Sequence, residues 1–448
     1  MPPCGSSWRL KKKTDLSQVL DPCTDEPPGG HGYGTNTICM FLRLVMSGVS
    51  LRGVPRVLAV LAEAFDLSLE IPHWTTGRLW LMRLGHAMLT MPLKKAKDWA
   101  WLADHSVQIG QEKGLAIVGV RLRDLPKRGE PLQQQDLHLI AWVPRKSWTR
   151  PEVDEALEQA TRRSGVPRVI VSDHGVDVAG GVSLFQERHP HTADIYDLKH
   201  KAACVMKHRL EKEPRWREFQ RQIGQTRCAV QQTEMAFLTP PAPKPKARFM
   251  NLERQLAWAE GVQEILREAP PQVDRWVRPE RLQEKVGWLK EFVAPVAEWS
   301  EWQQVVNTSV AFVNRQGIYR GAAKELRQQL PRKFAHCTTA TLAKELVRFV
   351  AVQARQAKSG ERLPGSTEIL ESCFGKMKEL EKQQSRGGFT HFMVSFGALL
   401  AETTAKVVDA ALKHSHTQDV YRWCNEQLGI TVFGQRKLAF ANGATKPG

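Results

Sequence analysis

The chain has 448 residues, a hydrophobic content of 42% and a formal net charge of +17 at pH 7. This length can bury a sizeable core, and the excess of cations favours a polyanionic partner, of which nucleic acid is the commonest. No apolar run is long enough to cross a membrane, no signal-peptide pattern begins the chain, and the eight cysteines form no CxxC pair. The composition therefore disfavours a membrane protein, a zinc ribbon and a disulfide scaffold, and we expect a soluble intracellular protein.

The N-terminal part is predicted to contain a leader and a helical module. Residues 1–35 are rich in Pro, Gly, Ser and charge, which is typical of a flexible segment. Residues 36–95 have helical patterns with a polar turn before the third helix, which predicts a helix-turn-helix-like DNA-binding module. A small helical bundle fits the pattern equally well. The arginines that could reach phosphates or base edges are Arg52, Arg56, Arg78 and Arg83.

From residue 99 the hydrophobic period changes from that of a helix to that of a strand. Five strands are predicted, at 99–110, 115–122, 137–143, 167–172 and 193–198. A helix over 150–164 separates the third strand from the fourth, and a helical turn separates the fourth from the fifth. This order predicts an α/β RNase H-like core with a mixed five-stranded sheet, of which residues 96–200 form the first part.

The rest of the chain has mainly helical patterns. Residues 201–360 predict a large all-helical insertion, and 361–442 predict the second part of the core with C-terminal helices, including helices over 392–414 and 417–428. Residues 443–448 are expected to be a loose tail. The insertion includes tryptophans whose commoner role is core packing and whose alternative is stacking on an unpaired base: Trp276, Trp288, Trp299 and Trp302.

Two aspartates lie within or directly after predicted strands, at positions where side chains of a sheet can bind a ligand. Asp104 interrupts the first apolar strand, where a carboxylate is costly to bury unless it is paired or bound to a metal. Asp173 follows the buried fourth strand, and ligands bind at such strand ends. A third acid is expected from a late helix. Glu371 lies closer than Glu368 to the apolar stripe of that helix, so Glu371 is the favoured third ligand and Glu368 the alternative.

Three carboxylates in one cleft would repel one another, and a divalent metal relieves that repulsion. Hard oxygen ligands select Mg²⁺, and Mn²⁺ can substitute for it. Two such ions about 4 Å apart would activate a water or a 3′-hydroxyl and stabilise the leaving oxygen of a phosphodiester. Asp104, Asp173 and Glu371 are therefore predicted to be catalytic metal ligands, and no organic cofactor is expected.

These motifs resemble those of bacterial insertion-sequence DDE transposases. VIVSDHG around Asp173, DLKH at 197–200 and ESCFGKMK at 371–378 are similar to the second motif, the segment after it and the third motif. WLADHSVQIG around Asp104 is similar to the first-motif strand. The long helical insertion resembles that of other transposases, including the hAT type. Gly365-Ser366-Thr367 stands where one branch of the family has the Tyr and Arg that precede its Glu.

The resemblance implies that the protein cleaves transposon ends and joins the 3′-hydroxyl to target DNA with two Mg²⁺ ions. Its partners would be the inverted-repeat ends and the target duplex, held by a homodimer on paired ends in the bacterial cytoplasm, at the nucleoid. No membrane partner is expected. The alternatives are a related nuclease of the RNase H fold and a non-catalytic DNA-binding protein derived from a transposase.

Further residues receive supporting roles. Lys378, seven residues after Glu371, would neutralise a phosphate of the bound end, and an ordinary surface lysine is the alternative. DNA contacts are also predicted for Lys199, Lys201 and Lys207, whose alternative is a solvated helix face. Residues that could orient water, support the acids or merely hold the local structure are His174, Asp197 and His200.

Overall fold

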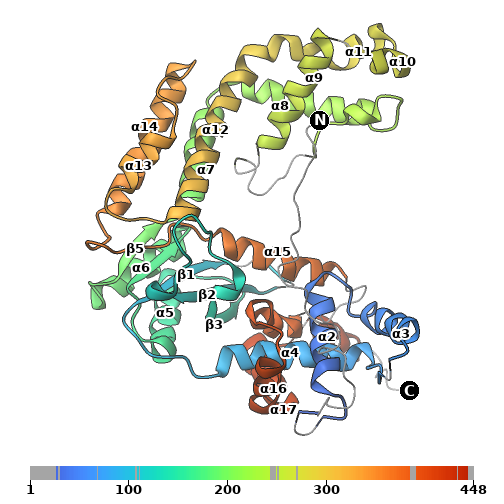
Figure 1. The fold of residues 1–448 in the computed structure, drawn as a ribbon, viewed down its shortest axis with the longest axis vertical. Helices are drawn as coiled ribbons and strands as arrows, with labels where there is room; N and C mark the ends of the chain where they lie inside the picture. The colour runs from blue at the N-terminus through green and yellow to red at the C-terminus, as the bar shows by residue number, and fades with distance from the viewer. Residues whose placement is uncertain are drawn as a thin grey trace, which may run out of the picture.

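The computed structural model describes residues 27–28, 31–67, 69–105, 108–109, 111–242, 249, 252–268, 271–383, 390–430 and 432–441. Most of the predicted leader and all of the predicted loose tail lie outside these residues. A five-stranded sheet occupies the middle of the molecule, with an elongated helical body at one side and a second group of helices at the other (Figure 1).

The sheet has an RNase H-like topology. Its strands are β1 (Trp99–His105), β2 (Lys113–Arg121), β3 (His138–Arg145), β4 (Val169–Ser172) and β5 (Ala193–Tyr196). They lie in the order β3-β2-β1-β4-β5. The β1–β2 and β2–β3 pairs are antiparallel, whereas the β1–β4 and β4–β5 pairs are parallel. The mixed five-stranded sheet predicted from the sequence is therefore confirmed.

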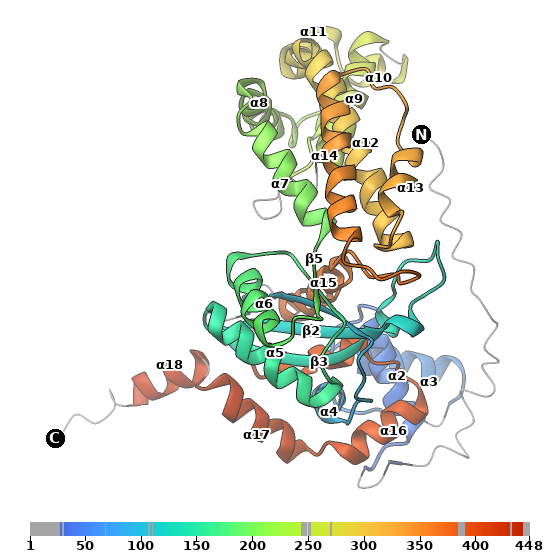
Figure 2. The same ribbon diagram turned by 90° about the vertical axis from the view of Figure 1, so that its left-hand side faces the viewer.

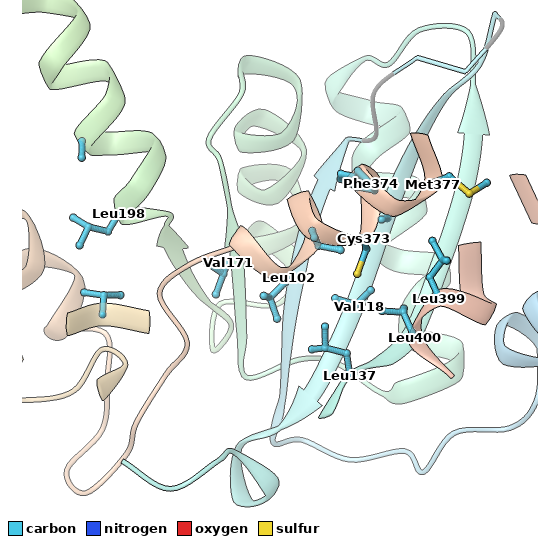
Figure 3. Close-up of a cluster of buried hydrophobic side chains, with 14 of the residues drawn as sticks. Leu102, Val118, Leu137, Val171, Leu198, Cys373, Phe374, Met377, Leu399 and Leu400 are labelled. Atoms are coloured by element: carbon cyan, nitrogen blue, oxygen red, sulfur yellow. The ribbon is translucent and has the colours of Figure 1, made fainter. Parts of the chain in front are cut away.

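Both faces of the sheet are covered. On one face, Trp101 packs with apolar residues of α5 (Arg150–Ser164) and α6 (Val176–Arg188). On the other, Leu102 and Val171 face α15 (Glu368–Lys382) and the 3₁₀ segment η7 (Thr390–Leu400), as Figure 3 shows. Burial on both faces explains why β1 and β4 are continuous apolar runs and not alternating ones.

The N-terminal helices share a core with the C-terminal ones. The helices concerned are α2 (Thr35–Met46), α3 (Val54–Ala64), α4 (Trp74–Thr90), α16 (Ala405–His414) and α17 (Thr417–Leu428). Helix α4 packs against η7, α16, α17 and α2, and residues 80–87 are all buried. The predicted continuous helix over 392–414 is wrong, because η7 and α16 are separate elements. A last helix, α18 (Val432–Ala441), was not predicted from the sequence.

The described part of 201–360 is helical, as predicted, apart from a single β-bridge between Ile318 and Leu363 that ties it to the segment before α15. The first helix of this region, α7 (Leu198–Leu210), begins just before residue 201. The others are α8 (Pro214–Val230), α9 (Glu253–Arg267), α10 (Pro271–Trp276), α11 (Pro279–Val286), α12 (Val293–Gln316), α13 (Ala322–Gln329) and α14 (Cys337–Ala354). Two short 3₁₀ segments, η4 (Ala236–Leu238) and η6 (Gly287–Phe292), also belong to this region, whereas η2 (Leu122–Asp124) and η3 (Gln134–Asp136) lie between β2 and β3. In both views α7, α12 and α14 run side by side away from the sheet (Figures 1 and 2).

Of the four tryptophans singled out from the sequence in this helical body, three are core residues. Trp299 and Trp302 are buried, and Trp288 is partly buried against the same core, which confirms the core-packing interpretation for these three. Trp276 differs, because 61% of its surface is exposed. Within the described residues, no helix combines the length and the apolar character that crossing a membrane requires.

Candidate active site

Asp104 and Asp173 lie at the ends of two neighbouring parallel strands. The register of β1 and β4 pairs Ala103 with Ser172, so Asp104 and Asp173 occupy the next positions on the two strands. Because side chains alternate along a strand, Asp104 lies on the same face as Leu102, which is the face covered by α15. The sheet therefore brings the two aspartates together at its carboxyl edge, under the helix that carries the third acid.

Asp104 is buried and feels the charge of its acidic neighbours. Only 8% of its surface is exposed, and its Oδ1 accepts a hydrogen bond from the backbone N–H of His105 at 2.6 Å. Burial, followed by the charge of Asp173 and to a smaller degree that of Glu371, raises the pKa of Asp104 to about 8. The three predicted acids thus interact electrostatically in one site, although they are distant in sequence.

Glu371 lies on the first turn of α15, at the edge of its buried face. The apolar side chains of this helix fix it on the sheet: Leu370 is buried, as are Cys373, Phe374 and Met377, which Figure 3 shows. Glu371 Oε2 accepts from Lys199 Nζ at 2.9 Å, and Glu371 Oε1 lies 3.9 Å from His200 Nε2. Glu371 therefore faces the start of α7, which follows directly on β5.

Glu368, the alternative third acid, has different surroundings. Its Oε1 accepts from Lys199 at 3.0 Å, and its Oε2 accepts from Asn314 Nδ2 at 2.6 Å. Asn314 belongs to α12, in the helical body. Glu368 is thus oriented partly toward that body. The charge of Glu371, by contrast, contributes to the raised pKa of Asp104.

Asp197 connects the start of α7 to the start of α15. It is fully buried and accepts hydrogen bonds from the backbone N–H of His200 and from the backbone N–H and hydroxyl of Thr367. Burial opposes its charge, but His200 and these hydrogen bonds outweigh burial and hold the pKa of Asp197 below its ordinary value. Asp197 therefore positions His200 and Glu371 relative to each other.

His200 lies among the carboxylates. Its Nδ1 is 3.7 Å from Asp197 Oδ1. Burial by itself would lower the pKa of His200, but the charges of Asp197, Asp173 and Asp104 outweigh burial and raise it to about 9. The imidazole is therefore cationic at neutral pH and, with Lys199, supplies positive charge to the acidic site.

His174 holds the loop after Asp173. Its backbone has a φ of 54°, which is uncommon for a residue other than glycine. Its ring stacks on Tyr196 with the centroids 4.4 Å apart, and its Nε2 lies 3.0 Å from Asp194 Oδ1. These contacts with β5 fix the turn that presents Asp173. His174 is thus held against the sheet by its contacts with Tyr196 and Asp194.

The donor chemistry of the three acids fits the predicted metal, because Mg²⁺ and Mn²⁺ prefer carboxylate oxygens. Among the residues that the structure describes, however, no three acidic, histidine or cysteine side chains are arranged to hold a metal ion as they stand. Glu371 is engaged instead by Lys199 and His200. Metal binding would require Glu371 to exchange these cationic neighbours for the ion.

The residues predicted to contact DNA have varied surroundings. Lys199 is only 20% exposed and pairs with both glutamates of α15, so its prediction as a DNA contact is not supported. Lys207 is exposed on α7, whereas Lys201 on α7 and Lys378 on α15 are half-buried. Within the described chain, none of Lys201, Lys207 and Lys378 has an acidic partner.

In the N-terminal helices, Arg52 and Arg56 are exposed, and Arg52 lies over the Trp74 ring at 4.7 Å. Arg78 lies over Phe392 at 5.5 Å, and burial lowers its pKa. Of the four arginines only Arg83 is buried, so its prediction as a DNA contact is not supported. It is 8% exposed and donates to the carbonyls of Ser415 and Leu412, so it ties α4 to the C-terminal helices.

His105 is a site-adjacent group that the sequence did not single out. It follows Asp104, and its Nδ1 lies 3.4 Å from Asp177 Oδ2. Burial and the nearby Lys113 lower its pKa to about 4, so the ring is neutral at pH 7. The contact with Asp177, 72 positions away in the chain, makes His105 distinctive, and no local motif could have indicated it.

Comparison with known proteins adds no relative: no known family model matches the chain, and no curated protein does. The interpretation of the site therefore depends on its topology, its acids and their neighbours. What these define directly is an α/β protein with an RNase H-like sheet and an acidic cluster at the carboxyl edge of its central strands.

Proposed function

We propose that this protein is a DDE-type DNA transposase, which cleaves the ends of a transposon and joins them to target DNA. The observation that carries the proposal is the adjacency of Asp104 and Asp173 on β1 and β4, with Glu371 above them on α15. An RNase H-like sheet with carboxylates at this edge has the groups that metal-dependent phosphodiester chemistry requires.

In this proposal, Asp104, Asp173 and Glu371 would hold two Mg²⁺ ions. Magnesium, when bound, would supply charge for the developing phosphorane-like state and lower the pKa of the attacking hydroxyl. His200 carries a positive charge at neutral pH and would attract the scissile phosphate to the acids. Asp197 would keep His200 in position through the hydrogen bonds that join α7 to α15.

The remaining parts would bind and arrange DNA. The net charge of +17 supports a polyanionic substrate. Exposed cations that could contact the duplex include Arg52, Arg56 and Lys207. A homodimer would pair the two transposon ends, because two ends must be joined to one target. In this proposal the protein acts at the bacterial nucleoid.

The test is a cleavage and strand-transfer assay with Mg²⁺ and duplexes taken from the DNA that flanks the gene. Asp104→Asn and Asp173→Asn should each abolish both reactions and leave duplex binding intact. Asp409→Asn, on the surface of α16, is the matched control and should retain both. Cleavage without transfer of a precleaved end would indicate a related nuclease, and binding without either reaction would indicate a non-catalytic DNA-binding protein.

A further inference from the structure

A basic cavity lies between α13 and α14, away from the acids of the sheet edge. Its volume is about 370 Å³, and four of its lining side chains are cationic. They are Arg327 at the end of α13, Arg332 and Lys333 in the connection, and Lys344 on α14. No acidic side chain of the described residues lines the cavity. Four cations around one hollow create a positive potential that attracts an anion.

The charges of this region are unbalanced for a specific reason. Between residues 322 and 354 the chain has six Lys or Arg side chains and only two Glu side chains. Each of these two acids is paired with an arginine from another element: Glu325 with Arg128 at 3.0 Å, and Glu345 with Arg209 at 3.3 Å. The two carboxylates of this segment therefore already have cationic partners, and the cavity keeps its positive charge.

The four cations have no acidic partner in the described structure. Arg327 makes a hydrogen bond only to the backbone carbonyl of Pro331, at 3.2 Å, which holds its guanidinium near the connection. None of Arg327, Arg332, Lys333 and Lys344 is within ion-pair distance of a carboxylate of the described residues, and all four are exposed. Cations with no acidic partner among the described residues are available to an anion outside the protein.

The connection that carries two of these cations is fixed to the helical body. Leu330 is buried, and the backbone N–H groups of Ala335 and His336 donate to Glu301 of α12 at 2.7 and 3.2 Å. The cavity is thus built on an anchored turn, which reduces the conformational entropy lost when a ligand binds.

We propose that this cavity binds the phosphate backbone of double-stranded DNA, outside the segment that the acids would cut. The proposal rests on the proposed function for its choice of duplex DNA as the partner. Guanidinium groups suit phosphate because they can donate two parallel hydrogen bonds, and lysines add charge. Such contacts would fix the position of the duplex on α13 and α14 and carry no sequence information.

The experiment measures binding of a blunt duplex by fluorescence anisotropy at several salt concentrations, without Mg²⁺. The test variant carries Arg327→Gln, Arg332→Gln, Lys333→Gln and Lys344→Gln. Each lost phosphate contact should reduce the slope of log binding constant against log salt by about 0.9, so the variant should lose about three to four units of slope. Circular dichroism melting checks that the variant folds.

The matched control removes four exposed cations that already have carboxylate partners: Arg221→Gln, Arg267→Gln, Arg281→Gln and Lys413→Gln. Its slope should stay within about one unit of the wild-type slope. Equal slopes for the test and control variants would overturn the proposal, as would tighter binding of single-stranded RNA than of duplex DNA at the cavity.

The result is independent of catalysis. Asp104→Asn should bind the duplex with the wild-type slope, because Asp104 is not part of the cavity. If the wild-type protein bound DNA through the cavity but did not cleave, the proposed function would fail and the cavity assignment would stand. If the wild-type protein cleaved DNA but the test variant kept the wild-type salt slope, the cavity assignment would fail and the proposed function would stand.

Discussion

The ammonium group of Lys199 lies 2.9 Å from Glu371 Oε2 and 3.0 Å from Glu368 Oε1, so one lysine joins two glutamates one helical turn apart. The two glutamates differ in their second contact. Glu371 approaches His200, which lies among the aspartates, whereas Glu368 accepts from Asn314 of the helical body. This difference favours Glu371 over Glu368 as the proposed third ligand, and Glu368 would then serve to hold Lys199 in place.

The two glutamates should respond differently to loss of charge. Glu371→Gln should abolish Mg²⁺-dependent cleavage, because it removes a proposed ligand. Glu368→Gln should lower the rate by only about tenfold, the scale expected for a group that supports a metal site without binding the metal. Single-turnover cleavage of the two variants makes the comparison. Complete loss of cleavage in Glu368→Gln, with cleavage retained in Glu371→Gln, would reverse the assignment.

Stability should depend on pH through Asp104. Its pKa in the folded protein, about 8, is far above the ordinary value, so between about pH 4 and pH 8 the folded state keeps a proton that the unfolded state releases. The free energy of unfolding should therefore fall as the pH rises through this window. Asp104→Asn has no such proton to lose and should be more stable than the wild type at pH 8, by a few kcal/mol.

Urea unfolding at pH 5 and pH 8 in the presence of EDTA measures this effect. The advantage of Asp104→Asn should be larger at pH 8 than at pH 5, because the wild-type carboxyl is mostly protonated at the lower pH. Added Mg²⁺ should stabilise the wild type more than the variant. An advantage that is equal at both pH values would show that burial of the charged carboxylate does not cost stability.

Arg83 and Arg52 distinguish a structural arginine from an exposed one. Arg83→Met should lower the free energy of unfolding by about 2–4 kcal/mol, because it leaves the carbonyls of Ser415 and Leu412 without their charged donor. Arg52→Met should cost less than about 1 kcal/mol, since only the contact with Trp74 is lost. Chemical denaturation compares the two. An Arg83→Met protein with an unchanged free energy of unfolding would mean that the packing of α4 does not depend on these hydrogen bonds.

The sequence predicted the sheet well because its signals are local. The apolar runs of β1 and β4 and the capped helix between β3 and β4 are visible in short windows, and they determine the strand order once the RNase H pattern is recognised. Asp104 and Asp173 could be singled out for the same reason, because each is a carboxylate within or directly after an apolar strand. Their adjacency needed only the parallel pairing of the two strands.

What the sequence did not predict depends on distant partners. Arg83 seemed available for DNA because the residues that bury it, 412 and 415, lie more than 300 positions away. Lys199 was assigned to DNA because its pairing with α15 bridges about 170 positions. The apolar run of η7 has no helical period that would separate a buried 3₁₀ segment from an α-helix, so 392–414 was read as one helix.

The close approach of α4 to η7 depends on Gly85. A Cβ at this position would overlap the carbonyl oxygen of Val394 and lie 2.6 Å from Cα of Ser395, so backbone would have to move. Gly85→Ala should therefore lower the free energy of unfolding by about 1–3 kcal/mol. Gly224→Ala is the matched control, because Gly224 lies on helix α8 with open space around its Cβ position, and it should raise stability by up to about 1 kcal/mol. Urea denaturation of both variants decides the matter: a Gly85→Ala protein as stable as the wild type would mean that α4 and η7 are not packed backbone to backbone.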